Sequence, residues 1–299
     1  MDLRAAAGLV RPFTMLAPAT GVLFASGAAA ARLAIPYDAR LVGLAVLAAA
    51  CANAASNAWN QAFDAEIDRV NKPERPIPSG RATVRGAFAL GTVAAALALV
   101  VGAAHATLVG HPWFLACLAT GVAATWSYSA PPLRTKRFTL GALLTIAVPR
   151  GFLVPVAGWA VLAVPRGAEP FALGAVPGLF VLGAAATKDF ADVEGDRAHG
   201  CRTLPVVLGA ERAARVVAPF LVLPFLLYPA FSALGWLARP LWAWSVLALV
   251  LALLGGATAR ALLSGPERLA TERNHPAWRG MYLLMLANQA GVALVYALA

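Results

Sequence analysis

The chain has 299 residues, of which 60% are hydrophobic and 13% are charged, and its mean hydropathy is +0.72. This composition excludes an ordinary water-soluble domain and indicates an integral membrane protein. The formal net charge of +10 is ambiguous by itself, because a basic chain can bind nucleic acid or can follow the charge rule of membrane proteins.

Apolar runs of about 20 residues recur along the chain, and each is long enough to cross the roughly 30 Å hydrocarbon layer as a helix. Because loops and open sheets cannot face lipid, these runs predict an all-α bundle, formed as a single domain over residues 1–299. The first run is too long for a cleaved signal peptide and is interpreted as a retained helix. Nine spans are predicted, at 13–33, 41–61, 84–104, 112–128, 139–161, 171–190, 212–234, 240–262 and 279–299.

The Lys and Arg residues are distributed unevenly between the two sides of the predicted bundle. Of the 24, only Arg32, Arg40, Arg166 and Arg239 fall in the connections opposite the N-terminus. This asymmetry is the positive-inside signature. It predicts a multi-pass protein of the cell (inner) membrane, with the N-terminus and the two acidic stretches described next on the cytoplasmic side, and it argues against nucleic acid as a partner.

The first acidic stretch, NAWNQAFDAEIDRVNKPERPIPSG at residues 57–80, follows the second span. Asn60, Asp64 and Asp68 recur at intervals of four, so they lie along one face of a helix. The Asn-Lys-Pro sequence at 71–73 then ends the helix, because proline removes a hydrogen-bond donor and restricts the residue before it.

The second acidic stretch, TKDFADVEGDRAHGCRT at residues 187–203, repeats the spacing with Asp192 and Asp196, and Asp189 precedes them. So many carboxylates at one membrane face require neutralisation by cations. We predict a pair of Mg²⁺ ions that bridges the two stretches to a polyanion such as a diphosphate.

Basic and hydroxyl side chains near the acidic stretches can complete such a diphosphate site, since arginine's planar fork matches phosphate oxygens. The same positions also suit topological anchors that touch anionic lipid headgroups, and both interpretations stay open. The candidate diphosphate ligands are Arg75, Tyr128, Ser129, Arg134, Lys136 and Lys188.

Arg150 lies inside the fifth span, between Pro149 and Gly151. A charged residue within a span is costly and indicates function, and proline and glycine beside it predict a broken helix that lines a cavity. Arg11 precedes the first span and suits either a snorkelling anchor or a contact with an anionic substrate.

The apolar body beneath the acidic mouth predicts that the diphosphate carries a long hydrocarbon, as an isoprenyl diphosphate does. Metal ions and basic side chains would stabilise the departing diphosphate, and an allylic cation shielded from water would be captured by a bound nucleophile. Paired carboxylates also serve in acid–base catalysis, but the repeated spacing favours metal binding. The predicted catalytic residues are Asp64, Asp68, Asp192, Asp196 and Lys188.

These motifs resemble those of the UbiA-type intramembrane prenyltransferases. The likeness includes the 60–80 stretch, KDFADVEGD at 188–196, RPFT at 11–14 and YSAPPLRTKR at 128–137. The resemblance implies nine helices around a central cavity with a cytoplasmic-side polar mouth, Mg²⁺ dependence, and prenyl transfer from an isoprenyl diphosphate to an acceptor. By matching position it implies that the ligands of Mg²⁺-diphosphate are Asn60, Asp64, Asp68, Asp192 and Asp196, with Asp189 as a helper.

One difference between this chain and the family's usual motif bears on the identity of the acceptor. Many members of the family have Asn-Asp where this chain has Asn60-Gln61, so one carboxylate is absent. Asn-Gln, together with YSxPPLRxKR and Arg150-Gly151, resembles the homogentisate branch. KDxxDxEGD is also shared with the chlorophyll-synthase and archaeal ether-lipid (digeranylgeranylglyceryl-phosphate-synthase) branches, so the subfamily stays open. We predict an aromatic, quinone-precursor acceptor whose acidic group meets Arg150 or Arg11, with chlorophyllide-type and glycerol-phosphate acceptors as alternatives.

Two other functions are compatible with parts of the pattern. A carrier of anionic lipids also needs many spans, but its site would lie near the bilayer midplane. A CDP-alcohol phosphotransferase gathers its aspartates in one stretch, whereas here they form two blocks. The expected partners are the isoprenyl diphosphate, a small lipophilic acceptor and membrane lipids, and the sequence indicates no required protein partner.

Overall fold

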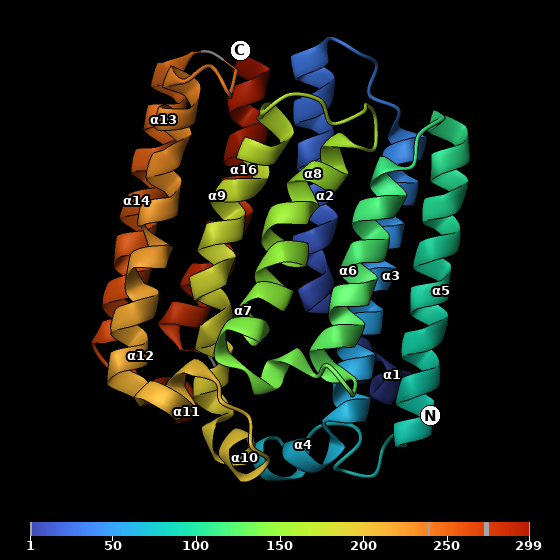
Figure 1. Cartoon of the computed structure of the whole chain (residues 1–299), viewed down its shortest axis with the longest axis vertical. Helices are drawn as coiled ribbons and strands as arrows, with labels where there is room; N and C mark the ends of the chain where they lie inside the picture. The colour runs from blue at the N-terminus through green and yellow to red at the C-terminus, as the bar shows by residue number, and fades with distance from the viewer. Residues whose placement is uncertain (1, 239, 272–274, 299) are drawn as a thin grey trace.

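The computed structural model describes residues 2–238, 240–271 and 275–298, and within these ranges the predicted all-α class is confirmed (Figure 1). Arg239, which entered the charge argument, lies outside them. Phe138 and Arg202 form an isolated bridge, and no strand is present in the described ranges. The elements are α1 (Leu3–Val10), α2 (Pro12–Leu33), α3 (Ala39–Phe63), α4 (Ala65–Asn71), α5 (Val84–Val109), α6 (Trp113–Ser129), η1 (Thr135–Arg137), α7 (Thr139–Ala147), η2 (Val148–Phe152), α8 (Leu153–Trp159), α9 (Glu169–Ala184), η3 (Ala185–Ala191), α10 (Val193–Ala198), α11 (Leu204–Leu208), α12 (Ala210–Val217), η4 (Ala218–Leu221), η5 (Leu223–Leu226), α13 (Leu227–Ala233), α14 (Leu241–Leu263), α15 (Arg268–Thr271) and α16 (Pro276–Leu298).

Eight helical spans in the described ranges are long and apolar enough to cross a membrane, one fewer than the nine predicted. The difference lies at residues 112–128, where α6 has only 17 residues and extends about 26 Å. Pro112 precedes α6 and Pro131 follows soon after it, so the helix cannot easily lengthen at either end. The all-α fold class is unchanged, because α6 is a helix that packs beside α5 within the bundle. The protein is an integral, multi-pass membrane protein.

The predicted break around Arg150 is present as η2, a π-helical turn between α7 and α8. Gly151 in this turn approaches α9 so closely that an added Cβ would lie 2.6 Å from the Cα of Gly178. The turn therefore depends on glycine for its packing and places Arg150 at the middle of the span.

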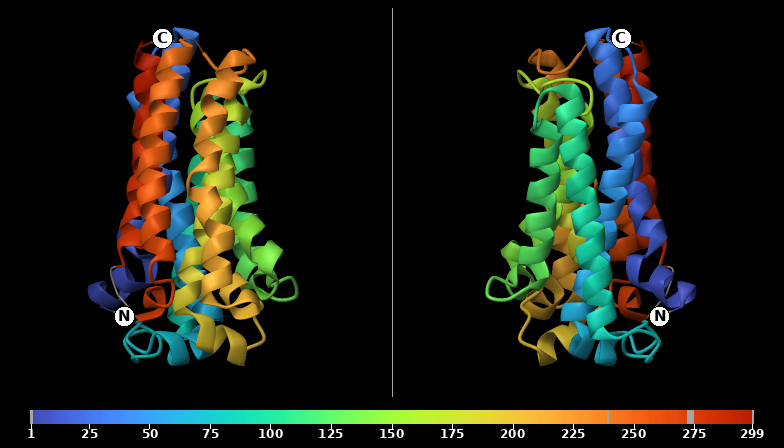
Figure 2. Two further views of the ribbon diagram at one scale, coloured as in Figure 1. Left: turned by 90° about the vertical axis from the view of Figure 1, so that its left-hand side faces the viewer. Right: turned by 90° about the vertical axis from the view of Figure 1, so that its right-hand side faces the viewer.

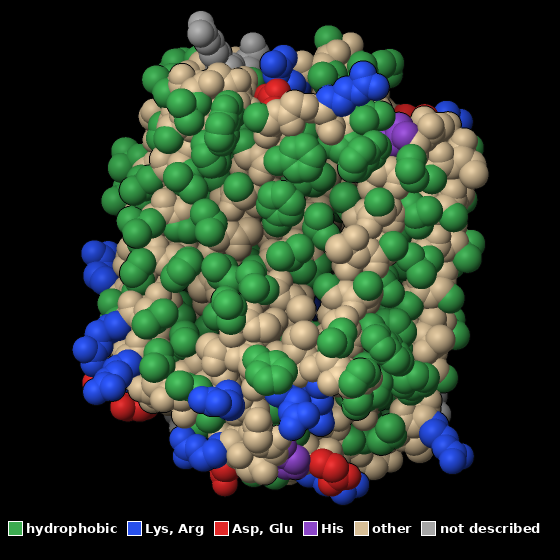
Figure 3. Space-filling model, in the orientation of Figure 1, with side chains coloured by type: hydrophobic (Ala, Val, Ile, Leu, Met, Phe, Trp, Pro, Cys, Tyr) green, Lys and Arg blue, Asp and Glu red, His purple; other side chains and the backbone are tan. Residues whose placement is uncertain are grey.

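Two apolar clusters form most of the interior. One joins α9, α12 to α14 and α16 around Phe225, Tyr228 and Trp244, and the other joins α2, α3, α6 and α8 around Val22 and Phe114. Many large apolar side chains of the outer helices remain exposed, as lipid-facing side chains do. Figure 3 shows this apolar band across the middle of the molecule, with Lys and Arg concentrated toward one end.

The short helices that carry the polar motifs gather at that same end. Figures 1 and 2 show α1, α4, α10 and α11 together below the long helices, on the side where the N-terminus lies. Contacts between α4 and α10 join two segments that are far apart in the sequence. The bundle therefore brings the two acidic stretches to one end.

Candidate active site

The first acidic block, defined as Asn60, Asp64 and Asp68, forms where α3 bends into α4. Asp64 is the C-cap residue of α3 and also the N-cap residue of α4, and its side chain makes no capping hydrogen bond. The carboxylates of Asp64 and Asp68 are buried, with only 7% and 4% of each residue exposed. Buried carboxylates need cationic or hydrogen-bond-donating partners. Asp64 and Asp68 each have a cationic partner that lies outside α3 and α4.

Asp64 receives its partners from α3 and from the basic segment after α6. Lys136 donates to its Oδ1 in a buried ion pair, and Arg134 lies 3.6 Å from the same oxygen. Asn60 Nδ2 donates to Asp64 Oδ2 at 2.7 Å and lies 3.4 Å from Ser129 Oγ. The Nε of Arg134 is buried without a hydrogen-bond partner among the described residues, so a donor remains for an anionic ligand.

Asp68 is held by Arg75, whose Nη1 donates to both carboxylate oxygens at 2.7 Å. Burial raises the pKa of Asp68 above its ordinary value, and Arg75 opposes that rise. The Pro-rich turn after α4 thus returns a guanidinium to the helix that precedes it.

The second acidic block, defined as Asp189, Asp192 and Asp196, forms where η3 passes into α10. Asp192 pairs with Lys72, the residue that caps the C-terminus of α4 in the first stretch. Asp196 accepts a hydrogen bond from Thr203 at 3.3 Å, and Asp189 lies 3.8 Å from Lys188. Burial, and next the charge of Asp192, raise the pKa of Asp196 to about 6.

Lys188 links the second block to α6. Its Nζ donates to the hydroxyl of Tyr128 at 2.6 Å and lies 4.6 Å from the centre of that ring, so a cation–π contact accompanies the hydrogen bond. Ser129, the next residue, contacts Asn60. The predicted hydroxyl and lysine ligands therefore lie between the two blocks.

The structure brings together the predicted metal and diphosphate residues. Lys136 pairs with Asp64, and its charge together with that of Asp64 also acts on Asp196, so the two blocks share one electrostatic environment. The carboxylates and cations at this end are Asp64, Asp68, Asp189, Asp192, Asp196, Lys72, Arg75, Arg134, Lys136 and Lys188.

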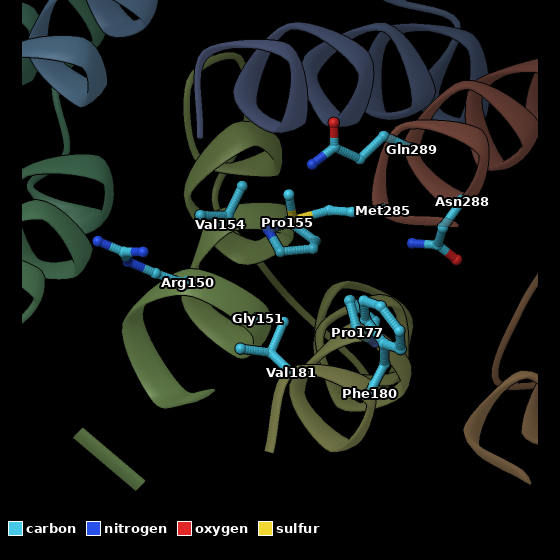
Figure 4. Close-up of a pocket in the computed structure, with 10 residues that line it drawn as sticks. All are labelled: Arg150, Gly151, Val154, Pro155, Pro177, Phe180, Val181, Met285, Asn288 and Gln289. Atoms are coloured by element: carbon cyan, nitrogen blue, oxygen red, sulfur yellow. The ribbon is translucent and has the colours of Figure 1, made fainter. Parts of the chain in front are cut away.

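The two predicted acceptor arginines lie apart from these ion pairs. Arg11, at the junction of α1 and α2, has a φ of 54°, and burial and Arg75 lower the pKa of its guanidinium. Arg150 is exposed although it lies in mid-span, and it lines a cavity of about 20 Å³ with Met285 and Gln289 of α16. Figure 4 shows its guanidinium directed away from Asn288. Neither arginine forms an ion pair with a described residue.

Two residues of this site, Asn71 and Lys72, were not among the predicted site residues. The sequence interpretation took 71–73 as the end of a helix and as part of the family signature, and gave these two side chains no role. Lys72 pairs with Asp192 across 120 residues, and burial lowers its pKa while Asp192 opposes the effect. Asn71 bonds to the backbone of Asp192 and Gly195. The sequence feature that could have indicated this ion pair is the position of Lys72, in the helix-ending segment directly after the first acidic block.

Gln61 turns away from the two blocks. Its Nε2 donates to the carbonyl oxygens of Leu9 at 2.9 Å and Gly8 at 3.2 Å, which are among the last of α1. The end of a helix leaves such acceptors without partners, so the amide at position 61 satisfies them. Gln61, which stands where many members of the family have an aspartate, therefore has a structural contact in this chain.

The donor atoms of the two blocks suit Mg²⁺, because they are carboxylate and amide oxygens. Among the described residues, no three His, Cys, Asp or Glu side chains are close enough to hold an ion by themselves. Mg²⁺ usually takes one or two carboxylates and completes its shell with water and substrate phosphate oxygens. The residues present therefore fit an ion whose remaining ligands come from a diphosphate.

A membrane-spanning helical bundle with two aspartate blocks and a cluster of cations at one end defines the class of intramembrane transferases that act on diphosphate substrates. The sequence profile described as the UbiA prenyltransferase family matches residues 16–275, so the chain belongs to this family. It is accordingly a prenyltransferase, an enzyme that transfers prenyl groups.

Relatives and solved structures agree with this placement. The bacteriochlorophyll synthase 33 kDa chain of Cereibacter sphaeroides is 35% identical over 71% of this chain and 69% of its own length. The digeranylgeranylglyceryl phosphate synthase of Methanopyrus kandleri is 36% identical over 85% of this chain and 90% of its own length. A UbiA homolog from Archaeoglobus fulgidus, bound to GPP and Mg²⁺, has the same fold, with a TM-score of 0.73, 21% identity, and coverage of 96% of this chain and 99% of that chain.

Proposed function

We propose that the protein transfers a prenyl group from an isoprenyl diphosphate to a lipophilic acceptor in a Mg²⁺-dependent reaction at the end of the bundle that holds the two acidic blocks. The observation that carries this proposal is the ion pair between Lys72 and Asp192, which joins the two acidic stretches. Lys136 pairs with Asp64, and its charge also opposes the rise that burial causes in the pKa of Asp196. Carboxylates from two distant stretches thereby share one set of cations, which is the arrangement a metal–diphosphate complex requires.

The basic residues would bind the diphosphate. Lys72, Arg75 and Lys136 now neutralise carboxylates, and they become available to phosphate oxygens when the carboxylates engage a metal. Mg²⁺, when bound, would neutralise the diphosphate and make it a better leaving group. The Nε of Arg134, which has no hydrogen-bond partner among the described residues, would add a donor for the charge that develops on the leaving oxygens.

The transfer breaks the bond between the allylic carbon and the diphosphate oxygen, whose electron pair leaves with the diphosphate. The acceptor nucleophile then forms a bond to that carbon and loses a proton. Lys188 and Tyr128, joined at 2.6 Å, would fix the diphosphate end, and the Lys188 ammonium lies over the ring of Tyr128. The membrane-embedded body excludes water that would otherwise capture the allylic cation.

The acceptor is proposed to carry an acidic group that meets Arg150 or Arg11, because neither guanidinium is neutralised by a described carboxylate. The relatives named above act, by their names, in bacteriochlorophyll and digeranylgeranylglyceryl phosphate synthesis. A chloroplastic homogentisate solanesyltransferase of Arabidopsis thaliana is 36% identical over 56% of this chain and 44% of its own length. An aromatic quinone precursor remains our first proposal, with chlorophyllide-type and glycerol-phosphate acceptors as alternatives.

The mouth of the site is proposed to face the cytoplasm of the cell (inner) membrane. The positive-inside asymmetry supports this orientation, and Figure 3 shows the basic side chains concentrated toward the end that holds the acidic blocks. Labelling of single cysteines introduced at Arg81 and at Arg166 from each side of sealed vesicles tests it. Labelling of position 81 from the outside would contradict this orientation.

The test of function is incubation of the purified protein with Mg²⁺, prenyl diphosphates of graded length and the three acceptor classes, followed by mass analysis of products and assay of released diphosphate. We expect a prenylated acceptor and an equal amount of diphosphate, and neither in the presence of a chelator. A lipid carrier would release no diphosphate, and the absence of diphosphate release would contradict the proposed prenyl transfer.

A further inference from the structure

Asp192 stands at the N-cap position of α10, where an aspartate ordinarily accepts a hydrogen bond from a backbone N–H of its own helix. In this protein its side chain makes no such bond. The N–H of Gly195, the third residue of α10, donates instead to Oδ1 of Asn71 at 2.8 Å. The cap of the second block is thus supplied by the first stretch.

Both ends of the Asn71 amide are used in this contact. While Oδ1 accepts from Gly195, Nδ2 donates to the backbone carbonyl of Asp192 at 3.0 Å. The close fit leaves no room for a side chain, since a Cβ on Gly195 would lie 2.6 Å from both Nδ2 and Oδ1 of Asn71. Asn71 therefore fixes the backbone of the N-terminal turn of α10 against the end of α4.

We propose that Asn71 is a positioning residue for the metal–diphosphate site: by capping α10 from the other acidic stretch, it frees the carboxylate of Asp192 for ligand binding and fixes the spacing of the two blocks. This inference rests on the proposed function. An aspartate that capped its own helix would turn its carboxylate toward the backbone. With the cap supplied by Asn71, the carboxylate of Asp192 instead pairs with Lys72.

The chain contains a matched control. His199 follows Asp192 by seven residues, as Asn71 follows Asp64, but its Nδ1 bonds to the carbonyl oxygen of Gly195 within its own segment at 2.8 Å. It makes a local contact of similar length and does not join the two blocks. The effect of its removal measures what the loss of a local hydrogen bond does at this end of the bundle.

The experiment compares the wild type with Asn71→Ala, Gly195→Ala, the double variant and His199→Ala. The probe is Mg²⁺ with inorganic diphosphate, and the readout is the rise in the midpoint of thermal unfolding as Mg²⁺ is added. We expect the half-saturating Mg²⁺ concentration to rise about tenfold in either single variant, the size of effect that residues supporting metal ligands commonly have. Because both changes remove the same contact, the double variant should be no worse than either single one.

Two results would overturn the proposal. One is an unchanged half-saturating Mg²⁺ concentration in Asn71→Ala with only a lower unfolding midpoint, which would show a purely structural contact. The other is an equal rise in His199→Ala. Because this readout does not require prenyl transfer, a wild type that binds Mg²⁺ and diphosphate but forms no product would contradict the proposed function and leave the role of Asn71 measurable.

Discussion

The first acidic block at the α3–α4 junction and the second at the η3–α10 junction share a backbone plan. In each, an aspartate ends one helix and begins the next with nearly the same dihedral angles, a φ of −103° and a ψ of 14° in Asp64, and −114° and 6° in Asp192. In each, a second aspartate follows four residues later. Neither junction aspartate caps its helix, so both carboxylates are available to other partners.

The two blocks differ in how their charge is neutralised. Both carboxylates of the first block have a cationic partner whose side chain is at most 13% exposed, Lys136 for Asp64 and Arg75 for Asp68. In the second block only Asp192 has a cationic partner within hydrogen-bond distance among the described residues, and Asp196 relies on the hydroxyl of Thr203. The first block is therefore largely neutralised by its own ion pairs, whereas in the second block Asp196 has no cationic partner within hydrogen-bond distance among the described residues. The predictions below test this difference.

The largest effect is expected from removal of the junction carboxylates. Asp64→Asn and Asp192→Asn should each lower the rate of prenyl transfer by about 100- to 1,000-fold, as the loss of one group that stabilises developing charge does elsewhere. Turnover at saturating Mg²⁺ is the measurement. Glu66→Gln is the control, because Glu66 is exposed and its ion pair among the described residues is with Arg69 on the same helix. Near-normal turnover in either aspartate variant would contradict a shared site.

The ion pairs of the two blocks should differ in stability without metal. Arg75→Ala leaves the carboxylate of Asp68 buried and unpaired, and we expect a loss of about 3 kcal/mol. Lys72→Ala should cost about 1 kcal/mol, because the side chains of Lys72 and Asp192 are each more than a fifth exposed. Thermal unfolding in detergent with a chelator measures both. Equal losses would show that the two blocks are neutralised alike.

A carboxylate at position 61 tests whether the first block can be made more acidic. Gln61→Asp should lower stability by about 2 kcal/mol, because the bonds to Gly8 and Leu9 are lost and a negative charge faces carbonyl oxygens at the end of α1. We expect no fall in the half-saturating Mg²⁺ concentration, since the side chain of Gln61 turns away from the blocks. A lower Mg²⁺ requirement would place position 61 in the metal site.

The smallest effect concerns pH and the second block. The pKa of Asp196 is raised from 3.8 to about 6. Between these two pH values the folded protein without metal therefore keeps the carboxyl of Asp196 protonated, whereas the unfolded chain releases that proton. Its contribution to stability is present below about pH 4 and is lost as the pH rises through about 6. Mg²⁺ needs the deprotonated carboxylate, so the half-saturating Mg²⁺ concentration should fall between pH 5 and 7. Asp196→Asn should reduce that pH dependence, and an unchanged profile would exclude Asp196 as its source.

Local patterns in the sequence were sufficient for several features of the protein. The proline and glycine around Arg150 predicted the break that appears as η2. The spacing of Asn60, Asp64 and Asp68 predicted one helical face, but the helix breaks at Asp64, so Asn60 lies on α3 and Asp68 on α4. The number of spans was one too high because hydropathy does not measure where Pro112 and Pro131 limit α6. Lys72 was missed because a lysine beside a membrane segment is ordinarily explained by topology alone.

The sequence by itself determined the membrane-spanning helical class, the two acidic stretches and the family, because hydropathy, periodicity and motif spacing are local properties of the chain. Only the tertiary structure decided that Asn71 caps α10, that Lys72 meets Asp192 and that Gln61 serves α1. Each of these contacts joins segments many residues apart in the sequence. It can form only where the packing of the long helices brings the ends of those segments close together. A hydrogen bond acts over about 3 Å, so no local pattern can specify its distant partner.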